Sequence, residues 1–327
     1  MPFLTTEAIQ GDKPLLFDGA ESFSGGMVSN VRANIIGPDQ SALLVNIDTD
    51  QTGQAVTRRG SSKPHATISA ANRIQGMFYY DIPSKEVQLE ATNTRIYEYD
   101  NSTVSAALAG YTGSSSTLLV EFAQSNDKVY WVDGDTTMYK YDGTTVTASG
   151  GWGVAVPPPS GLRYIVEHQN RIAAAGDPNN PEYLYFSDVL SEEYPLANIV
   201  KVGDGTGDPI RGIISWIDAL FLVFKERSIY LVDTSQGVGS SAIIRRLHNS
   251  IGCVSHRTIK QVGQDVLFLS AEGVRSIDRT LQEGQQSITN PLSFPINDYF
   301  QRINWSNIAA NSCAIFWNNR YLLSVPL

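Results

Sequence analysis

The chain has 327 residues, of which 42% are hydrophobic, 10% aromatic and 17% charged. This composition excludes a disordered chain and is typical of a folded, strand-rich protein with a large core. The net charge of −9 argues against a protein that grips nucleic acid by neutralising its phosphates.

The two cysteines, Cys253 and Cys313, have neither metal nor redox spacing, so we expect two buried thiols in a reducing compartment. The first residues show no basic leader before an apolar core. No apolar run approaches the roughly 20 residues that span a bilayer. We therefore expect a soluble protein, made in the cytoplasm, with no membrane partner.

Glycines punctuate the beginning of the chain, and we expect residues 1–42 to form an N-terminal arm. Two short strands are predicted next, at Leu43–Asp48 and Gln54–Arg59. The T-D-Q-T-G segment between them, Thr49–Gly53, is typical of a hairpin turn, because glycine supplies the positive φ that such turns need.

One hairpin pattern then recurs along the chain. Two short apolar strands are joined by a polar turn and closed by an aspartate, at Glu86–Asp100, Lys128–Asp142, Arg171–Asp188, Ala219–Asp233 and Asp265–Asp278. The fourth residue before the closing aspartate is always apolar, and the third is a tyrosine in all copies but the last, which has Arg275. A strand-rich repeat of roughly 40–50 residues predicts a β-propeller, with one small sheet per repeat.

Each predicted blade also needs an inner strand. We expect these strands at Gly76–Asp81, Leu118–Phe122, Leu162–Glu167, Ile210–Trp216 and Thr258–Val262. Their apolar residues do not alternate cleanly with polar ones. This pattern favours strands that are covered on both faces, since each blade lies between two others.

The two ends of the chain are predicted to complete one blade together. Asn307–Trp317 and Arg320–Leu327 supply two strands of a sixth repeat and no outer hairpin follows them. An open sheet edge is normally covered. We therefore expect an all-β protein whose residues 43–327 form a single six-bladed propeller, with residues 43–60 closing it by pairing N-terminal with C-terminal strands.

Motifs for catalysis or metal binding are missing from the sequence. It has no phosphate-binding loop, H-E-x-x-H or G-x-S-x-G motif, and its four histidines are scattered. His248 and His256 flank a glycine turn, and core or loop roles explain them better than a shared metal. Gly203–Asp208, G-D-G-T-G-D, lacks the third carboxylate and the bidentate glutamate of a calcium loop. We expect no catalytic residue, cofactor or metal.

The closing aspartates allow a second interpretation. In propeller glycosidases a pair of axial acids performs the chemistry. Acids at strand ends also commonly bind the backbone N–H groups of turns, and a strictly repeated acid favours this structural role. We therefore expect no enzyme. A glycan-binding or glycan-cleaving propeller is the alternative.

Short motifs near the N-terminus point to a known family. F-S-G-G-M-V-S-N at Phe23–Asn30 is followed by G-P-D-Q-S at Gly37–Ser41, V-N-I-D at Val45–Asp48 and T-R-R-G at Thr57–Gly60. This order resembles the N-terminal region of phage tail nozzle and hub proteins of the "tubular tail protein B" type. Leu220–Val232, Ile251–Ile259 and Leu267–Val274 are similar to the propellers of such proteins. Nozzle proteins of the best-known short-tailed phages are longer and carry extra domains.

The resemblance implies a structural protein of the virion tail, made in the host cytoplasm. Such proteins form a ring of copies of themselves, typically six, below the adaptor, and they contact tail fibres or other tail proteins. The genome passes through the ring without specific binding, and an acidic wall suits this passage. The motif residues expected to interact with partners are Phe23, Gly25, Gly26, Asn30, Asn46, Arg59 and Gly60.

Overall fold

The structure is a computed structural model that describes residues 22–32, 35–49, 54–58, 60, 73–100, 103–203, 205–283 and 290–327. The chain divides into two compact units. The N-terminal unit comprises Met1–Ser62 and Leu292–Arg302, and the propeller unit comprises Lys63–Pro291 and Ile303–Leu327. Residues 43–60, expected in the last blade, therefore belong to the N-terminal unit.

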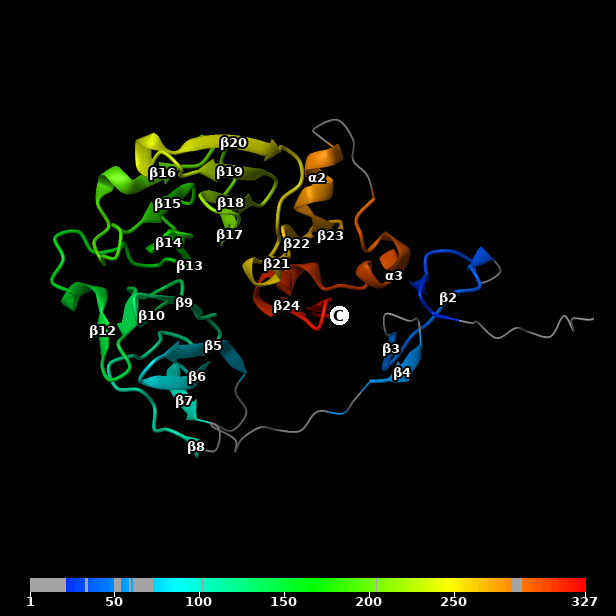
Figure 1. The fold of residues 1–327 in the computed structure, drawn as a ribbon, viewed down its shortest axis with the longest axis horizontal. Helices are drawn as coiled ribbons and strands as arrows, with labels where there is room; N and C mark the ends of the chain where they lie inside the picture. Colours follow the sequence, from blue (N-terminus) through cyan, green and yellow to red (C-terminus); the bar gives the residue numbers. More distant parts are fainter. Residues whose placement is uncertain are drawn as a thin grey trace, which may run out of the picture. The chain divides into compact units, whose positions relative to one another are not determined.

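Four antiparallel four-stranded sheets form the first part of the propeller unit, and they stand side by side around a common centre (Figure 1). Their strands are β5 (Ile74–Ile82), β6 (Lys85–Thr92), β7 (Arg95–Asp100) and β8 (Thr103–Val104) in blade 1; β9 (Glu121–Ser125), β10 (Lys128–Val132), β11 (Tyr139–Tyr141) and β12 (Val146–Ala148) in blade 2; β13 (Tyr164–His168), β14 (Arg171–Ala175), β15 (Tyr183–Phe186) and β16 (Ile199–Lys201) in blade 3; and β17 (Ile210–Ser215), β18 (Leu220–Lys225), β19 (Ile229–Asp233) and β20 (Ile243–His248) in blade 4. The all-β propeller prediction is confirmed.

Blade 5 has three strands, β21 (Lys260–Val262), β22 (Asp265–Ser270) and β23 (Gly273–Ser276). The helix α2 (Ile277–Glu283) follows β23, where the other blades have their fourth strand. Later the chain forms the short helix α4 (Ile308–Asn311) and then a last hairpin, β24 (Cys313–Trp317) and β25 (Arg320–Ser324).

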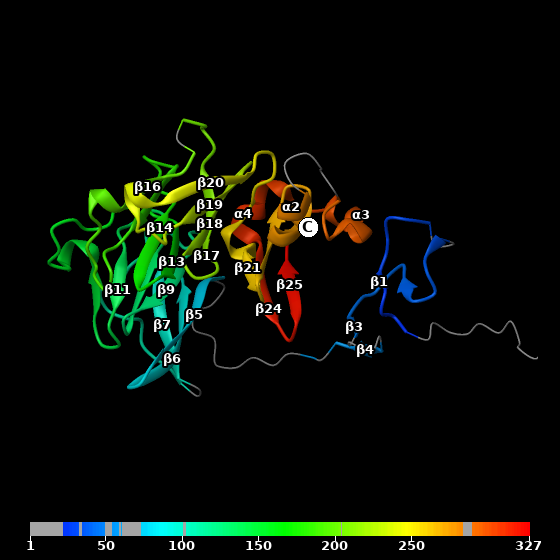
Figure 2. The same cartoon turned by 45° about the horizontal axis from the view of Figure 1, so that its top comes forward.

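The prediction of six blades closed by the chain termini is wrong for this structure, which has five blades. The hairpin β24–β25 forms a two-stranded sheet of its own beside β21 (Figure 2), where the Tyr321 hydroxyl donates to the Thr258 carbonyl. In the N-terminal unit, β3 (Ile47–Thr49) and β4 (Ala55–Thr57) pair with each other and with no other described strand. In each terminal hairpin the two strands hydrogen-bond to each other along one edge. The local sequence pattern therefore did not require the N-terminal and C-terminal hairpins to pair.

The core of the propeller unit lies between neighbouring blades. Alternate residues of one strand enter two different clusters, because successive side chains point to opposite faces. In β18, Phe221 and Val223 pack toward blade 3, whereas Leu222 and Phe224 pack toward blade 5. All four are 0% exposed. In the inner strand β17, Ile213 packs toward blade 3 and Ile214 toward blade 5, so the expectation of inner strands covered on both faces is confirmed for blade 4.

The same alternation repeats in the other blades. In β10, Val129 and Trp131 pack toward blade 1 while Tyr130 and Val132 pack toward blade 3. The apolar residue four before each closing aspartate belongs to this core: Ile96, Met138, Leu184 and Ile229 are at most 1% exposed, and Val274 is half-buried. The repeat in the sequence is thus a repeat of inter-blade packing.

Tight turns join several of the hairpins. Asn126 and Asp127 between β9 and β10 have φ of 50° and 59°, and Asn318 and Asn319 between β24 and β25 have φ of 49° and 58°. Two central residues with positive φ match the twist of the flanking strands, and asparagine and aspartate tolerate this conformation. These turns fix the register of the hairpins.

The five predicted hairpins are confirmed as β6–β7, β10–β11, β14–β15, β18–β19 and β22–β23. In blade 2 the inner strand begins at Glu121, three residues later than predicted. The prediction for the thiols is right for Cys253, which is buried, and wrong for Cys313, which lies on the exposed face of β24. Among the described residues, no helix is long and apolar enough to cross a membrane.

The N-terminal unit contains a short parallel pair of strands, β1 (Gly26–Met27) and β2 (Gln40–Ser41). The predicted hairpin of the two following strands is confirmed, with Ile47 opposite Thr57. A later segment of the chain also belongs to this unit, with the 3₁₀ turn η7 (Phe294–Ile296) and the helix α3 (Asn297–Phe300).

Candidate functional site

The motif residues with which the family resemblance begins build the N-terminal unit. The Gly26 N–H donates to the Phe23 carbonyl over 2.9 Å, and the Gly25 N–H donates to the Asp39 carbonyl over 3.0 Å. A Cβ at Gly25 would lie 2.5 Å from Gln40 Cγ. The F-S-G-G and P-D-Q motifs therefore lie against each other, and glycine is required at their closest approach.

Asn30 links these motifs to the segment around η7. Its side-chain amide donates to the Phe294 carbonyl over 2.7 Å, and its backbone N–H donates to the Pro295 carbonyl over 3.3 Å. The neighbouring Ser29 N–H donates to the same Pro295 carbonyl over 3.0 Å, and the Ser29 hydroxyl donates to Asp298. Two segments more than 260 positions apart in sequence are thereby fastened together.

The remaining motif residues lie near the hairpin β3–β4. Asn46 has a φ of 56°, and its carbonyl accepts from the Arg58 N–H over 2.8 Å. Gly60 is exposed. Arg59 lies outside the described residues. Of the seven predicted interaction residues, Phe23, Gly25 and Gly26 lie where the two motifs meet, Asn30 binds the segment around η7, and Asn46 lies at the start of the hairpin.

Two of the closing aspartates hold turns, whereas Asp188 accepts from the side-chain amide of Asn198 over 2.7 Å. Asp142 accepts from the backbone N–H groups of Thr144 and Thr145 over 2.9 and 2.8 Å. The hydrogen bond from the Thr145 N–H is the main cause of the lowered pKa of Asp142. The Asp233 carboxylate likewise accepts from the Ser235 N–H over 2.9 Å. This matches the structural role predicted for these acids.

The described histidines are engaged in local structure. His168 bonds Ser215 and Thr234, each over 2.8 Å, and its side chain is 1% exposed. The Nδ1 of His248 accepts from the backbone N–H of Ile251 over 3.0 Å, and the Nδ1 of His256 accepts from that of Ile213 over 3.4 Å. Within the part of the chain that the structure describes, no group of three His, Cys, Asp or Glu residues could hold a metal ion.

The glycine-rich loop at Gly203–Asp208, of which Asp204 is not described, is organised by a buried acid. The Glu182 carboxylate accepts from the N–H groups of Gly205 and Gly207 over 2.8 and 3.1 Å, and from the Thr206 hydroxyl over 3.0 Å. Lys225 lies 3.5 Å from the same carboxylate. These bonds occupy the acid that faces the loop.

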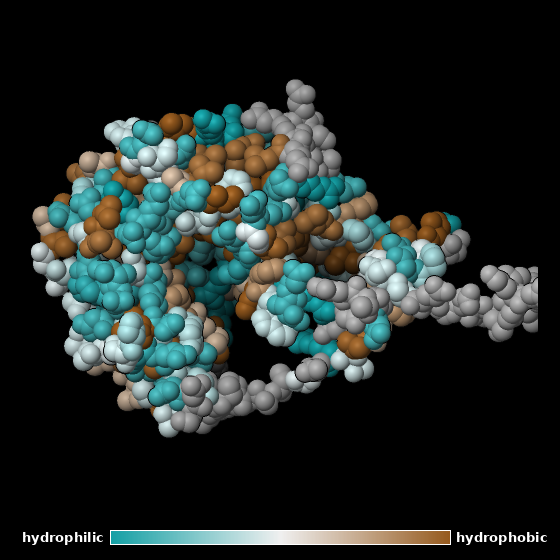
Figure 3. Space-filling model, in the orientation of Figure 1, coloured by the Kyte–Doolittle hydropathy of each residue, from teal (hydrophilic) through white to brown (hydrophobic). Residues whose placement is uncertain are grey.

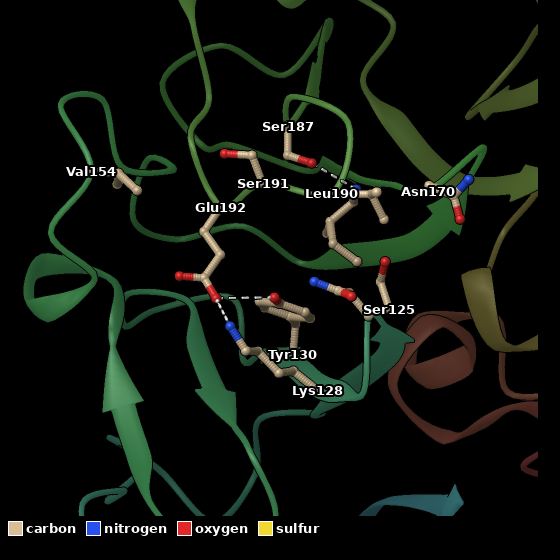
Figure 4. Close-up of a pocket in the computed structure, with 11 residues that line it drawn as sticks. Ser125, Lys128, Tyr130, Val154, Asn170, Ser187, Leu190, Ser191 and Glu192 are labelled. Atoms are coloured by element: carbon tan, nitrogen blue, oxygen red, sulfur yellow. Dashed lines mark hydrogen bonds and ion pairs between the residues drawn. The ribbon is translucent and has the colours of Figure 1, made fainter. Parts of the chain in front are cut away.

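A polar pocket of about 240 Å³ lies between blades 2 and 3 (Figure 4). Glu192 is its central charge. It accepts from Lys128 over 2.7 Å and from the Tyr130 hydroxyl over 3.2 Å, and it also pairs with Lys140. Burial, followed by the charge and hydrogen bond of Glu192, raises the pKa of Tyr130. Lys128 and Lys140 share the one carboxylate of Glu192, so this cluster joins two blades and keeps a net positive charge.

A second pocket, of about 210 Å³, lies where the inner strands of several blades begin. We call it the axial pocket. The surface is hollowed at the centre of the blades, and the residues visible there are mainly hydrophilic (Figure 3). The axial pocket is lined by Glu121, Arg163, Tyr164, Arg211, His256 and Arg257, among others. Each of the inner strands β9, β13 and β17, and the 3₁₀ turn η5 (His256–Thr258) before β21, thus supplies a polar side chain.

These arginines were not among the residues predicted from the sequence. Arg163 directly precedes β13, Arg211 is the second residue of β17, and Arg257 lies in η5. Arg73 directly precedes β5 in the same way, and donates to Asn311 over 2.8 Å and to the Thr117 carbonyl over 2.6 Å. The signal was an arginine near the start of the inner strand in four of five repeats, which becomes visible only when the strand starts are known.

The topology defines this chain as a β-propeller protein. No family model matches the chain, and no curated protein matches it. Solved structures that are similar include the extracellular domain of a putative hybrid two-component system from B. thetaiotaomicron, with 13% identity over 75% of this chain and 32% of that chain and a TM-score of 0.48. Others are the computationally designed Ika8 protein, with 14% identity, 77% and 76% coverage and a TM-score of 0.46, and the WD40 propeller domain of Doa1, with 13% identity, 70% coverage of both chains and a TM-score of 0.43.

Proposed function

We propose that the chain is a structural protein of a bacteriophage tail, a nozzle or hub that assembles as a ring with copies of itself. The observation that carries the proposal is the network around Asn30. The residues with which the family resemblance begins, Phe23–Asn30 and Gly37–Ser41, are hydrogen-bonded to each other and to the segment around Pro295. The motif residues thus form one hydrogen-bonded element of the structure.

The described chemistry suits a structural role. Asp142 and Asp233 hold turns, the acid of the glycine-rich loop is bound by backbone N–H groups, and Glu192 is paired with two lysines. The net charge of −9 suits a channel wall that repels phosphates. On this proposal six copies surround the genome, one face of the ring meets the adaptor, and another meets tail fibres or other tail proteins.

The test is the composition of purified phage particles whose genome carries this gene. We expect the 35.8 kDa chain in intact particles, at six copies when it is quantified against a structural protein of known copy number. Gold-labelled antibody should mark the tail in electron micrographs. A chain that is abundant in the lysate but absent from washed particles would overturn the proposal.

The glycan-binding alternative has its own test. A labelled full-length chain would be applied to a glycan array, with a known propeller lectin as a positive control. The tail-structure proposal expects no saturable signal. Saturable binding by the purified chain, together with its absence from particles, would favour the alternative.

A further inference from the structure

The axial pocket gathers cationic side chains in a chain that is acidic overall. Arg163, Arg211 and Arg257 come from three successive blades and line the same pocket. They converge because the inner strands of neighbouring blades run side by side, so that their first residues lie at the same end of the propeller. Of the acidic residues, Glu121 and Asp133 line the pocket.

Both acidic residues are already bonded within the protein. Glu121 accepts from Arg257 Nε over 2.5 Å. Asp133 is 3% exposed and accepts from the Thr136 N–H over 2.7 Å and from the Thr136 hydroxyl over 2.6 Å. These acids therefore complete local structure and have little capacity left to attract a cation into the pocket.

The three arginines differ in how many hydrogen-bond and ion-pair partners their guanidinium groups have. Arg257 is bound by Glu121 and by the backbone carbonyls of Gln75 and Val120. Arg211 pairs with Glu226 over 2.6 Å. Arg163 is exposed. Its backbone N–H donates to the Ala175 carbonyl over 3.0 Å, but among the described residues its guanidinium has no hydrogen-bond or ion-pair partner. Its side chain lies against the turn at Gly134, where a Cβ would come within 3.0 Å of Arg163 Cγ.

Neutral donors stand beside this cation. Tyr164 follows Arg163 directly, and its ring lies 5.0 Å from that of His256. Among the described residues, the Tyr164 hydroxyl has no hydrogen-bond partner. The Nδ1 of His256 accepts from the Ile213 N–H. Since burial keeps the pKa of His256 at about 4, the imidazole is neutral near pH 7 and carries its proton on Nε2, as a donor.

We propose that the axial pocket binds a compact oxyanion, a carboxylate or phosphate group of a small molecule, with the Arg163 guanidinium as its main partner. The planar fork of arginine matches two oxygens of either group. A volume of about 210 Å³ holds such a group together with part of its carrier. The site goes beyond the proposed structural role and does not depend on it.

Calorimetric titration of the full chain tests the site. The probes are sodium phosphate and sodium succinate at constant ionic strength, with sodium chloride as the reference titrant. We expect saturable binding of at least one probe and none of chloride. Tighter binding of phosphate would identify a phosphate carrier as the source of the group, and tighter binding of succinate a carboxylate carrier. Saturation by neither probe overturns the proposal.

Variants then assign the binding to the pocket. Arg163→Gln should weaken the bound probe at least tenfold, the scale of one hydrogen bond to a charged group. Arg163→Lys should recover part of the loss, because it keeps the charge without the fork. Arg246→Gln removes another exposed arginine, on the outer strand β20, and should leave binding unchanged. Equal losses in Arg163→Gln and Arg246→Gln, or no loss in Arg163→Gln, would overturn the assignment.

A check on folding accompanies these variants. Thermal unfolding and circular dichroism of Arg163→Gln should match the unmodified chain, because the side chain is exposed and unbonded by the described residues. Tyr164→Phe offers a second measure that keeps the ring and its packing on His256. It should weaken the probe by less than Arg163→Gln does. Unaltered binding in both variants would place the anion elsewhere.

Discussion

The ammonium of Lys225 lies 3.5 Å from the carboxylate of Glu182, and none of the lysine side chain is exposed. Lys225 also donates to the Gly203 carbonyl over 3.3 Å and to the Thr206 hydroxyl over 3.2 Å, and it lies 5.5 Å from the centre of the Tyr230 ring. A charge taken out of water needs such partners. The pair thus joins blades 3 and 4 beneath the glycine-rich loop.

We expect Lys225→Met to destabilise the chain by about 3–5 kcal/mol, because it leaves the buried Glu182 carboxylate without its counter-charge. The free energy of unfolding would be measured in urea. Glu226→Gln is the control, since it breaks the pair with Arg211, whose side chains are 36% and 43% exposed. An exposed pair contributes less than about 1 kcal/mol. Similar losses in the two variants would contradict a special role for the buried pair.

Two tryptophans should respond very differently to truncation. Trp131 is 0% exposed and stacks on Tyr139 with ring centres 5.7 Å apart, whereas Trp317 on β24 is 64% exposed. Trp131→Ala should cost about 3–5 kcal/mol through the cavity between blades 1 and 2. Trp317→Ala should cost less than about 1 kcal/mol in the isolated chain. Urea unfolding of both variants checks this, and a large loss in Trp317→Ala would show that its face is covered.

The repeat in the sequence predicted the propeller because the apolar residues that recur are the ones that pack between neighbouring blades. Ile96, Leu184 and Ile229 occupy equivalent positions between blades, so packing imposes the period on the sequence. The number of blades could not be read in this way. The last hairpin, β24–β25, could by its sequence be the first two strands of another blade, and only tertiary pairing decides whether further strands join it.

The axial pocket could not be predicted from the sequence, for a different reason. Arg163, Arg211 and Arg257 are nearly one repeat apart, but each stands at a different offset from the start of its inner strand. Helical turns and loops between the blades shift these offsets. The convergence of the three side chains follows from the arrangement of the blades, which no single repeat contains.

Two glycines with nearly the same φ allow the cost of a steric clash to be distinguished from the cost of a left-handed backbone. Gly239 has a φ of 67°, and a Cβ there would lie 1.7 Å from the Ala197 carbonyl oxygen. Gly263 has a φ of 64° with nothing within 4 Å of a Cβ. Gly263→Ala should cost about 1–2 kcal/mol for the left-handed conformation alone. Gly239→Ala should cost clearly more, because backbone must move. Equal losses of stability in urea would contradict the close approach of Gly239 to Ala197.

Buried histidines should make the chain sensitive to acid. Burial, reinforced by the charge of Arg171, lowers the pKa of His168 to about 4 from a usual value of 6.5. In the unfolded chain His168 takes up a proton below pH 6.5, whereas in the folded chain it does so only near pH 4. Its neutral form therefore stabilises the fold above pH 6.5, and this stability is lost as the pH falls toward 4, by about 3 kcal/mol in total.

Urea unfolding at pH 7.5, 5.5 and 4.5, followed by tryptophan fluorescence, measures this loss. His168→Gln should lower stability at pH 7.5, because glutamine reproduces only part of the bonding to Ser215 and Thr234. It should also flatten the dependence of stability on pH between 6.5 and 4. His256, whose pKa is likewise about 4, keeps part of the slope in that variant, and adding His256→Gln should remove it. An unchanged slope in the double variant would mean that other groups carry the acid sensitivity.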